Sequence, residues 1–544
     1  MFVEPVFGKR FFGREEVLAT LHKRVTALKG GYRQNLALTG PMLAGKSSIL
    51  RHFLDNVEDN DIIPLYLEMT GEDFPVFCKR FTGSLLHNYL ISMGRCPGKQ
   101  IEELKKICGK MIPETISCID KVERALRRKS FNIAYETLLG MTSVFRTETG
   151  KSCLVILDEF HNLADFKLKR PFRTFGKFIM VQKNTMYIVS SSQKTLLKDI
   201  LSRKLSLLFG NFEVVEVEGF DNHTARSYVA DKIPATNGEY GHISNYIIQV
   251  TQGSPFYLEV LSGRFSELRR KAPGKAPEET LLDAFADILY SSEGILNQYF
   301  NNNVNFFLEK RSRKKYLSIL VSLAAGNATL KDIQEDSGRI DKSLSRKLRK
   351  LQEMDLIYKC GVFYKISDKL FEHWLRYVYT VKSRSMLDDM GIKYLEFKNA
   401  VQADFRDYME FSSRDIPELV VELFRSFNNE MVGVRMNDRR MPRFNDVTIT
   451  EKSRHFTRIT CLKGEKAWIC DIIKGDIAGE ADVHRMLENR SGKGHKKVLR
   501  RIIIPLKGLD QNAFLLAKER KIWVWDIKQL NLIFRLFKRF QIVA

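Results

Sequence analysis

Short apolar runs alternate with helical patterns over the first 215 residues of the chain. A continuous apolar run bounded by polar residues is typical of a strand in a parallel sheet that is covered on both faces. Residues 97–130 read as polar helices, either a plain helical insertion or a lid or partner surface. The pattern therefore predicts an α/β domain over residues 1–215. Its predicted strands are 36–38, 62–67, 153–157 and 186–189.

A different pattern, three helices followed by a hairpin, covers residues 313–366. Residues 313–326 and 330–335 have helical periodicity, and a third helix, which Asp341 or Ser343 can cap, runs to about residue 354. Strands at 356–359 and 363–366 flank a turn at residues 360–362. This order is typical of a winged helix-turn-helix, whose third helix reads the DNA major groove. The predicted DNA-binding residues on that helix are Lys342, Arg346, Lys347, Arg349 and Lys350. The alternative is a packing domain with a solvated basic face.

The last third of the chain mixes both periodicities. A helix is predicted at 417–427, strands at 447–449, 457–460 and 467–470, a helix at 481–489, and strands at 501–505 and 522–525. This order predicts a second α/β domain.

Size and composition narrow the class of protein. A chain of 544 residues is too long for one hydrophobic core, so about three domains are expected. No apolar stretch approaches the roughly 20 residues that span a bilayer, and residues 1–5 do not resemble a secretory signal. Eight scattered cysteines without a C-x-x-C pair favour reduced thiols over a zinc site. We therefore expect a cytoplasmic protein without a membrane partner.

The net charge of +23 is distributed unevenly. The net charge is +6 over residues 1–300, +7 over 301–380 and +10 over 381–544, so the excess per residue is largest in the last two segments. Such an excess of positive charge favours polyanionic partners, and nucleic acid is the leading candidate. General solubility is the competing explanation, and charge alone does not separate the two.

Residues 40–47 carry the pattern G-x-x-x-x-G-K-[ST], which cradles phosphates in nucleotide hydrolases. The segment follows a predicted strand and opens a helical pattern, which is the context that the motif needs. Backbone N–H groups at a helix N-terminus bind a polyphosphate. Lys46 would reach the β- and γ-phosphates and Ser47 would hold Mg²⁺. The predicted nucleotide-binding residues of this segment are Gly40, Pro41, Met42, Leu43, Ala44, Gly45, Lys46, Ser47 and Ser48.

Paired acids follow the predicted strand at 153–157. Asp158 is assigned to the metal and Glu159 to the base that polarises the attacking water. The next predicted strand ends in serines, and either Ser190 or Ser191 suits a sensor of the γ-phosphate, although an ordinary Ser-rich loop is an equal alternative. Lys46, Glu159 and Ser190 form the predicted catalytic set.

These residues together resemble the archaeal-type ATPases, a family related to the AAA+ ATPases. Phe11-Phe12-Gly13-Arg14-Glu15-Glu16 is similar to the opening of that family, residues 157–160 read L-D-E-F, and residues 251–255 are similar to its G-x-P motif. The resemblance covers residues 1–380 well and the remainder loosely. It implies that Gly13 and Arg14 pack on the adenine and that Pro255 lies near the nucleotide. The implied domains are a P-loop core at 1–215, a helical lid at 216–305, a winged helix at 306–380 and a C-terminal domain at 381–544.

One departure from the family concerns an arginine. Where the family commonly has L-[YF]-G-R, residues 208–211 read Leu-Phe-Gly-Asn, so Asn211 replaces the arginine. If that arginine stabilises the transferring phosphoryl group, its loss costs about 10³-fold or more in rate. Arg203 is a candidate substitute. Slow hydrolysis is therefore expected.

The C-terminal order resembles the restriction-endonuclease-like domain of some archaeal-type ATPases. Candidate residues of a nuclease site are Glu418, Asp446, Asp471 and Lys474. Carboxylates would bind metal and the lysine would position the water. However, residues 471–474 read D-x-x-K, and residues three apart on a strand point to opposite faces. Both an active nuclease and a degenerate, structural or DNA-holding domain remain open.

Three functions follow from these patterns. The first is an ATPase that binds Mg-ATP and couples nucleotide state to DNA binding through the basic winged helix. The second is an ATP-gated, metal-dependent nuclease. The third is a slow-hydrolysing ATP switch that holds a protein partner instead of DNA. A homo-oligomer is a further possible assembly.

Overall fold

A computed structural model describes residues 4–57, 59–96, 98, 100–205, 210–233, 240–308, 313–336, 338, 341–384, 389–434, 437–488 and 497–543. The chain divides into two compact units. Unit 1 comprises Met1–Phe220 with two short segments, Ser254–Phe256 and Glu353–Asp355. Unit 2 comprises Asp221–Gly253, Tyr257–Gln352 and Leu356–Ala544. The predicted end of the P-loop core at residue 215 lies close to the end of the first segment of unit 1.

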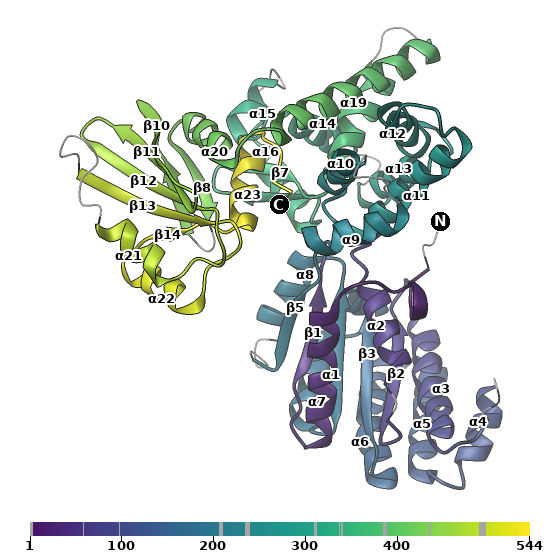
Figure 1. Cartoon of the computed structure of the whole chain (residues 1–544). Coiled ribbons are helices and arrows are strands. Elements are labelled where there is room, and N and C mark those ends of the chain that lie inside the picture. The colour runs from purple at the N-terminus through teal and green to yellow at the C-terminus, as the bar shows by residue number, and fades with distance from the viewer. Residues whose placement is uncertain are drawn as a thin grey trace. The chain divides into compact units, whose positions relative to one another are not determined.

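Unit 1 is built on a five-stranded parallel sheet (Figure 1). The strands are β1 (Asn35–Thr39), β2 (Ile62–Glu68), β3 (Ser152–Asp158), β4 (Thr185–Ser191) and β5 (Phe212–Glu216), in the order β2-β3-β4-β1-β5. The helices are α1 (Glu15–Lys29), α2 (Lys46–Asp55), α3 (Phe74–Ser92), α4 (Ile101–Cys108), α5 (Pro113–Arg127), α6 (Phe131–Thr149), α7 (Pro171–Val181) and α8 (Lys194–Asp199). Short helical turns are η1 (Gly8–Arg10), η2 (Phe160–Phe166) and η3 (Ile200–Lys204).

Alternate residues of the central strands bury opposite faces of this sheet. Leu36 and Leu38 pack with Ile156 in one core, and Ala37 packs with Val155 in the other. Because both faces are covered, the strands read as unbroken apolar runs. The four predicted strands are confirmed to within two residues at each end, and α4 and α5 confirm helices in the 97–130 insertion. The edge strand β5 was not predicted, because its three apolar residues are interrupted by Glu213 and none of its residues is fully buried.

Unit 2 begins with helices and continues into the elements of the predicted winged helix. The first helices are α9 (Asn222–Lys232), α10 (Gly241–Thr251), α11 (Pro255–Lys271), α12 (Pro277–Phe285) and α13 (Ile295–Phe307), with the turn η5 (Ala286–Tyr290). Then follow α14 (Arg313–Ala324), α15 (Leu330–Asp336), α16 (Leu344–Glu353) and the antiparallel hairpin of β6 (Ile357–Cys360) and β7 (Phe363–Ile366). The three predicted helices and the hairpin are thus present.

A second five-stranded sheet, in the order β10-β11-β12-β13-β14, forms the end of unit 2. Its strands are β10 (Asp446–Lys452), β11 (Phe456–Lys463), β12 (Lys466–Ile473), β13 (Lys497–Pro505) and β14 (Trp523–Val524), beside the hairpin of β8 (Glu430–Val434) and β9 (Asn437–Met441). The helices are α17 (Lys369–His373), α18 (Thr380–Arg384), α19 (Met390–Ser412), α20 (Ile416–Arg425), α21 (Glu480–Glu488), α22 (Gln511–Glu519) and α23 (Ile527–Leu536), with the turn η6 (Trp374–Tyr379).

The β6–β7 hairpin shares a hydrophobic core with this second sheet. Ala328, Cys360 and Phe363 belong to the cluster that also contains residues of α20, β11, β12 and α23. The N–H of Val362, in the hairpin turn, donates to the carbonyl of Met431 on β8 (2.9 Å). Gly361 has φ +64°, and a Cβ there would collide with the Met431 carbonyl, so the contact requires glycine. The turn of the predicted wing is therefore docked on β8.

Candidate functional site

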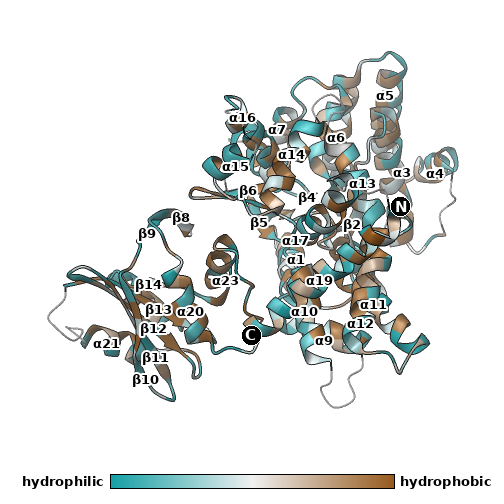
Figure 2. Ribbon diagram, turned by 90° about the horizontal axis from the view of Figure 1, so that it is seen from above, coloured by the Kyte–Doolittle hydropathy of each residue, from teal (hydrophilic) through white to brown (hydrophobic). Residues whose placement is uncertain are grey.

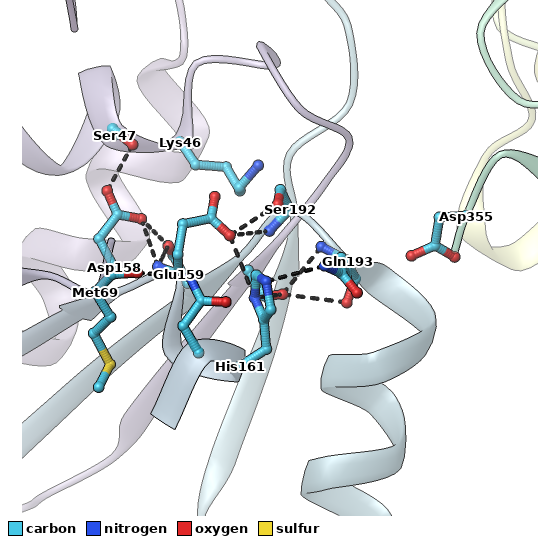
Figure 3. A network of polar contacts seen from close by, with 12 residues as sticks. Lys46, Ser47, Met69, Asp158, Glu159, His161, Ser192, Gln193 and Asp355 are labelled. Carbon is cyan, nitrogen blue, oxygen red and sulfur yellow. Dashed lines mark hydrogen bonds and ion pairs between the residues drawn. The ribbon is translucent and has the colours of Figure 1, made fainter. Parts of the chain in front are cut away.

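The carboxyl ends of three neighbouring strands bring the predicted site residues of unit 1 to one edge of the sheet. The phosphate loop follows β1, the paired acids end β3 and the serines end β4 (Figure 3). Strand β4 lies between β1 and β3, so one additional strand separates the loop from the acids. Ligands of parallel α/β sheets bind at this edge. The fold thus brings together the site residues that were predicted from separate segments of the chain.

The phosphate loop turns directly into α2. Gly45 directly precedes the first residue of the helix and has φ +92°. This left-handed conformation favours glycine. At Gly40 the requirement is different: a Cβ would collide with the carbonyl of Val217, so this glycine serves the packing of the loop against the chain after β5. Ser48 accepts a hydrogen bond from the N–H of Val6 (3.0 Å), which ties the N-terminal segment to α2.

Lys46 lies inside the loop. Its side chain is only 4% exposed, and Nζ donates to the carbonyls of Gly40 and Pro41 at 2.9 Å each. Burial lowers the pKa of Lys46, while the carboxylates of Glu159 and Asp158 act in the opposite direction. The ammonium group is held where an anion in the loop would meet it.

Asp158 is fully buried and accepts hydrogen bonds from hydroxyl groups. Oδ2 accepts from Ser47 Oγ and from Tyr66 OH at 2.6 Å each, and Oδ1 accepts from Ser190 Oγ. The N–H of Glu159 also lies 3.2 Å from Oδ1. In the described part of the chain, no lysine or arginine forms an ion pair with this carboxylate. A buried carboxylate without a cation is costly.

This donor set fits a magnesium ion. The hydroxyl of Ser47 and the carboxylate of Asp158 are adjacent hard oxygen ligands, and the uncompensated charge of Asp158 would be balanced by the ion. The described residues contain no group of three or more His, Cys, Asp or Glu side chains that could hold a metal. This is consistent with Mg²⁺, which is usually held by one or two protein groups together with phosphate oxygens and water.

Glu159 follows β3 in a left-handed conformation (φ 54°). Its Oε2 accepts from the N–H and the hydroxyl of Ser192, at 2.9 and 2.8 Å, and lies 3.3 Å from Nδ1 of His161. Figure 3 shows these groups converging on one carboxylate oxygen. Among the residues that the structure describes, no hydrogen bond reaches Oε1. One oxygen is thus anchored and the other is left to accept a proton.

His161, Ser192 and Tyr66 were missed by sequence reasoning. His161 is buried; its Nδ1 lies 2.9 Å from Ser191 Oγ and its Nε2 lies 3.1 Å from Gln193 Nε2. Burial is the main cause that lowers the pKa of His161, which favours the neutral ring. Only its place two residues after Glu159 could have drawn attention to it. Ser190 lies on Asp158, and its assignment as a γ-phosphate sensor stays a prediction.

Arg14, which precedes the phosphate loop in the chain, holds that loop in place. Its guanidinium donates to the carbonyls of Ala44 (3.0 Å) and Glu218 (2.6 Å) and lies over the ring of Phe220. Gly13, with φ 65°, precedes it. The structure therefore gives Arg14 a role in holding the loop, and adenine packing stays a prediction. Pro255 is the first residue of α11, and its predicted place near the nucleotide also stays a prediction.

The segment with the missing arginine is only partly described. Residues 208 and 209 lie outside the described residues, and Asn211 precedes β5. Arg203, the candidate substitute, is 82% exposed and forms an ion pair with Asp199 on its own helical segment (3.2 Å). It therefore takes no part in the hydrogen-bonded network around Glu159.

Helix α16 carries the predicted DNA-binding face. Figure 2 shows it as largely hydrophilic, and its buried residues are Leu344, Leu348 and Leu351. Lys347 differs from the rest of the basic set because it is half-buried and pairs with Asp341 at 2.5 Å. The exposed members on α16 are Arg346, Arg349 and Lys350, and the exposed Lys342 precedes the helix.

The hypothesised nuclease residues do not come together. Asp471 is fully buried, and its carboxylate accepts from Nε and Nη2 of Arg458 at 2.7 and 2.6 Å. Through the β10–β11–β12 register, Asp446 is level with Ala467, four residues before Asp471. That spacing is about 13 Å along a strand.

The other two candidates also lie apart from a metal site. Glu418 is an exposed residue of α20. Lys474 follows the end of β12, and its N–H donates to the carbonyl of His455 (2.9 Å). Within the described residues no carboxylate cluster forms around Asp471. Arg458 pairs with Asp471, and the four candidate residues are not brought together into one site.

Two further observations bear on sequence expectations. In the described ranges, no helix combines the length and apolar character that crossing a membrane requires. All eight cysteines are free thiols, of which six are buried, Cys118 is half-buried and Cys96 is exposed.

Comparisons with solved structures give distant likenesses. The Walker-type ATPase of Pyrococcus abyssi is 18% identical, with a TM-score of 0.46 over 68% of this chain and 97% of that chain. The ORC2 protein of Aeropyrum pernix is 10% identical, with a TM-score of 0.43 over 74% and 98%. The ORC1 protein of the same organism, in complex with DNA, is 14% identical, with a TM-score of 0.37 over 67% and 92%. No family model and no curated protein matches the chain. What identifies unit 1 as a P-loop α/β fold is its own loop and strand order.

Proposed function

We propose that unit 1 binds Mg-ATP and hydrolyses it slowly, as an AAA+-type ATPase. The observation that carries this proposal is the pairing of Ser47 with Asp158 at 2.6 Å, beside Lys46 in the phosphate loop. A loop that ends in Lys and Ser, at the edge where Asp158 and Glu159 end a neighbouring strand, contains the groups that phosphoryl transfer to water needs.

The roles of the residues follow from their positions. Lys46 would exchange its contacts with the loop carbonyls for the β- and γ-phosphates. Ser47 and Asp158 would hold Mg²⁺, which supplies neutralisation of the charge that develops on the phosphate oxygens. Arg14 would keep the loop fixed through its bond to Ala44, so that less reorganisation accompanies binding.

Glu159 would orient the attacking water and accept its proton at Oε1. Because Ser192 and His161 hold Oε2, the carboxylate is positioned without being neutralised by an arginine or lysine. Asn211 supports slow turnover, since the arginine that the family resemblance leads one to expect is replaced there.

DNA binding through α16 is the second part of the proposal. The turn of the β6–β7 hairpin is docked on β8, so the hairpin tip is covered and the exposed basic residues of α16 are left as the reading surface. Nucleotide state in unit 1 would then alter how strongly this surface binds DNA.

ATP turnover with and without duplex DNA tests the proposal, using Lys46→Ala, Glu159→Gln and Arg346→Gln. Lys46→Ala should abolish ATP binding or turnover. Glu159→Gln should retain ATP binding and lose about 10²–10⁴-fold in turnover, as expected for loss of a general base. Arg346→Gln should keep turnover and weaken DNA binding at low salt.

Two outcomes would overturn the proposal. Full turnover by Lys46→Ala would reject the nucleotide site. DNA affinity that is weak, insensitive to salt and unchanged by Arg346→Gln would reject the DNA-binding part and favour a protein partner instead.

A further inference from the structure

Two arginines converge on one tryptophan at the edge of the second sheet. The guanidinium carbons of Arg439 on β9 and Arg500 on β13 lie 4.9 and 4.4 Å from the ring centre of Trp523 on β14. The Trp523 ring in turn meets Trp468 on β12 edge-on, with ring centres 5.2 Å apart. Arg439, Arg500, Trp468 and Trp523 are called the arginine–tryptophan cluster below. All four belong to unit 2.

Within the described residues, the positive charge of the arginine–tryptophan cluster is not balanced by an ion pair. In the ranges that the structure describes, neither arginine forms an ion pair or a side-chain hydrogen bond. The carboxylate nearest in sequence, Asp438, lies beside Gly433 instead. Burial lowers the pKa of Arg500, and the neighbouring charge of Arg439 lowers it further. Two like charges thus lie close enough to affect each other.

Unmet hydrogen-bond donors accompany this charge. Arg500 Nε and Trp468 Nε1 are both buried and have no acceptor within the described part of the chain. A buried donor without an acceptor costs about 1–3 kcal/mol, and most buried polar groups in proteins are satisfied. An oxyanion beside the two guanidinium groups would supply both an acceptor and the missing negative charge.

The surroundings favour a polymeric anion. Lys466 and Lys497 are paired in register at the same end of β12 and β13, and both are exposed. Residues 381–544 carry a net charge of +10. A guanidinium fork matches the geometry of phosphate oxygens, and arginine together with aromatic rings is a common combination in nucleic-acid-binding grooves.

We propose that the arginine–tryptophan cluster binds a phosphate group of a nucleic-acid backbone. This contact is separate from α16 and rests neither on nucleotide binding in unit 1 nor on the basic helix. Its chemistry is recognition of the phosphodiester by two arginines, which adds affinity without reading sequence.

The test compares Arg439→Gln with Arg440→Gln, its exposed neighbour on the same strand. Adjacent strand residues point to opposite faces, so the two variants remove the same charge from different places. Binding of a fluorescein-labelled duplex to the full chain is followed by anisotropy over a range of salt. For Arg439→Gln we expect about tenfold weaker binding, the loss of one charge-assisted contact. We also expect a salt slope smaller by about 0.9.

Arg440→Gln should change affinity by less than about twofold, since it removes no clustered charge. Equal effects of the two substitutions, or no effect of Arg439→Gln, would overturn the proposal. Arg500→Lys provides a second variant that keeps the charge but removes the guanidinium fork, and we expect it to weaken binding as well. Tryptophan fluorescence and far-ultraviolet circular dichroism establish that each variant is folded.

Two further arms identify the source of the phosphate. Inorganic tripolyphosphate, added at constant ionic strength, should compete only weakly with the duplex. Strong competition that Arg439→Gln abolishes would mean a small polyphosphate ligand and would overturn the nucleic-acid assignment. Arg346→Gln on α16 should weaken duplex binding additively with Arg439→Gln, so failure of one surface can be distinguished from failure of the other.

Discussion

Two buried aspartates occupy similar places in the two sheets and have opposite surroundings. Asp158 ends β3 and Asp471 lies near the end of β12, and both side chains are fully buried. Asp158 is surrounded by the hydroxyls of serine and tyrosine. Asp471 is held by two nitrogen atoms, Nε and Nη2, of Arg458 on the neighbouring strand.

The difference lies in charge balance. The Asp471–Arg458 pair is neutral as a unit, and its bidentate geometry uses both carboxylate oxygens. The hydroxyl donors of Asp158 solvate its charge without cancelling it, so a cation is still needed. An acid that follows an apolar strand can therefore be either a metal ligand or a structural ion, and the neighbouring strand decides which.

The largest expected effect comes from removing the arginine. Arg458→Met would leave Asp471 buried and unpaired, and we expect unit 2 to lose about 3–5 kcal/mol in unfolding free energy. The double variant Arg458→Met/Asp471→Leu should recover most of that loss, because it removes both charges. Urea unfolding followed by tryptophan fluorescence measures this, since all four tryptophans lie in unit 2. A loss below about 1 kcal/mol in the single variant would contradict a structural ion pair.

A smaller effect, of opposite sign at the two sites, is expected from neutralising each aspartate. Asp471→Asn leaves Arg458 with the half-exposed Glu451 as its remaining ion-pair partner (3.1 Å) and should cost about 2 kcal/mol. Without magnesium, Asp158→Asn should instead leave unit 1 unchanged or more stable by about 1 kcal/mol, because it removes an uncompensated buried charge. Hydrogen exchange of strands β3 and β12 reports the two sites separately.

The variants Asp158→Asn and Asp471→Asn also test which of the two aspartates binds magnesium. Magnesium and ATP together should raise the stability of unit 1 in the wild type and in Asp471→Asn but not in Asp158→Asn. If Asp158→Asn responded to magnesium like the wild type, the comparison between the two aspartates would fail.

The smallest expected effect is on the pH dependence of stability, and it tests the state of His161, which contacts Glu159. Burial lowers the pKa of His161 below its usual 6.5. At pH values between the lowered pKa and 6.5, the unfolded chain therefore binds more protons than the folded chain. The contribution of the neutral ring is present above pH 6.5 and is lost as the pH falls below it. His161→Gln should therefore reduce the decline in stability of unit 1 between pH 7.5 and pH 5.5, measured by hydrogen exchange. An unchanged pH dependence would mean that His161 is not held neutral.

Much of unit 1 could be predicted because its signals are local. The strands β1 to β4 are unbroken apolar runs, and the loop at 40–47 needs only its own residue types to be recognised. The partners of Asp158, Glu159 and Asp471 could not be predicted, because cross-strand register and side-chain reach decide them. Tyr66 meets Asp158 through the pairing of β2 with β3, and Arg458 meets Asp471 through that of β11 with β12.

The docked hairpin has a consequence for how this protein can be divided. The second sheet and the β6–β7 hairpin bury Cys360 and Phe363 in one core, and Gly361 admits the backbone of β8 at close contact. A fragment ending near residue 380 would expose this apolar surface to water and would be prone to aggregate. Residues 381–544 are therefore an integral part of the folding unit and not a detachable module, and any fragment that contains the basic helix should retain them.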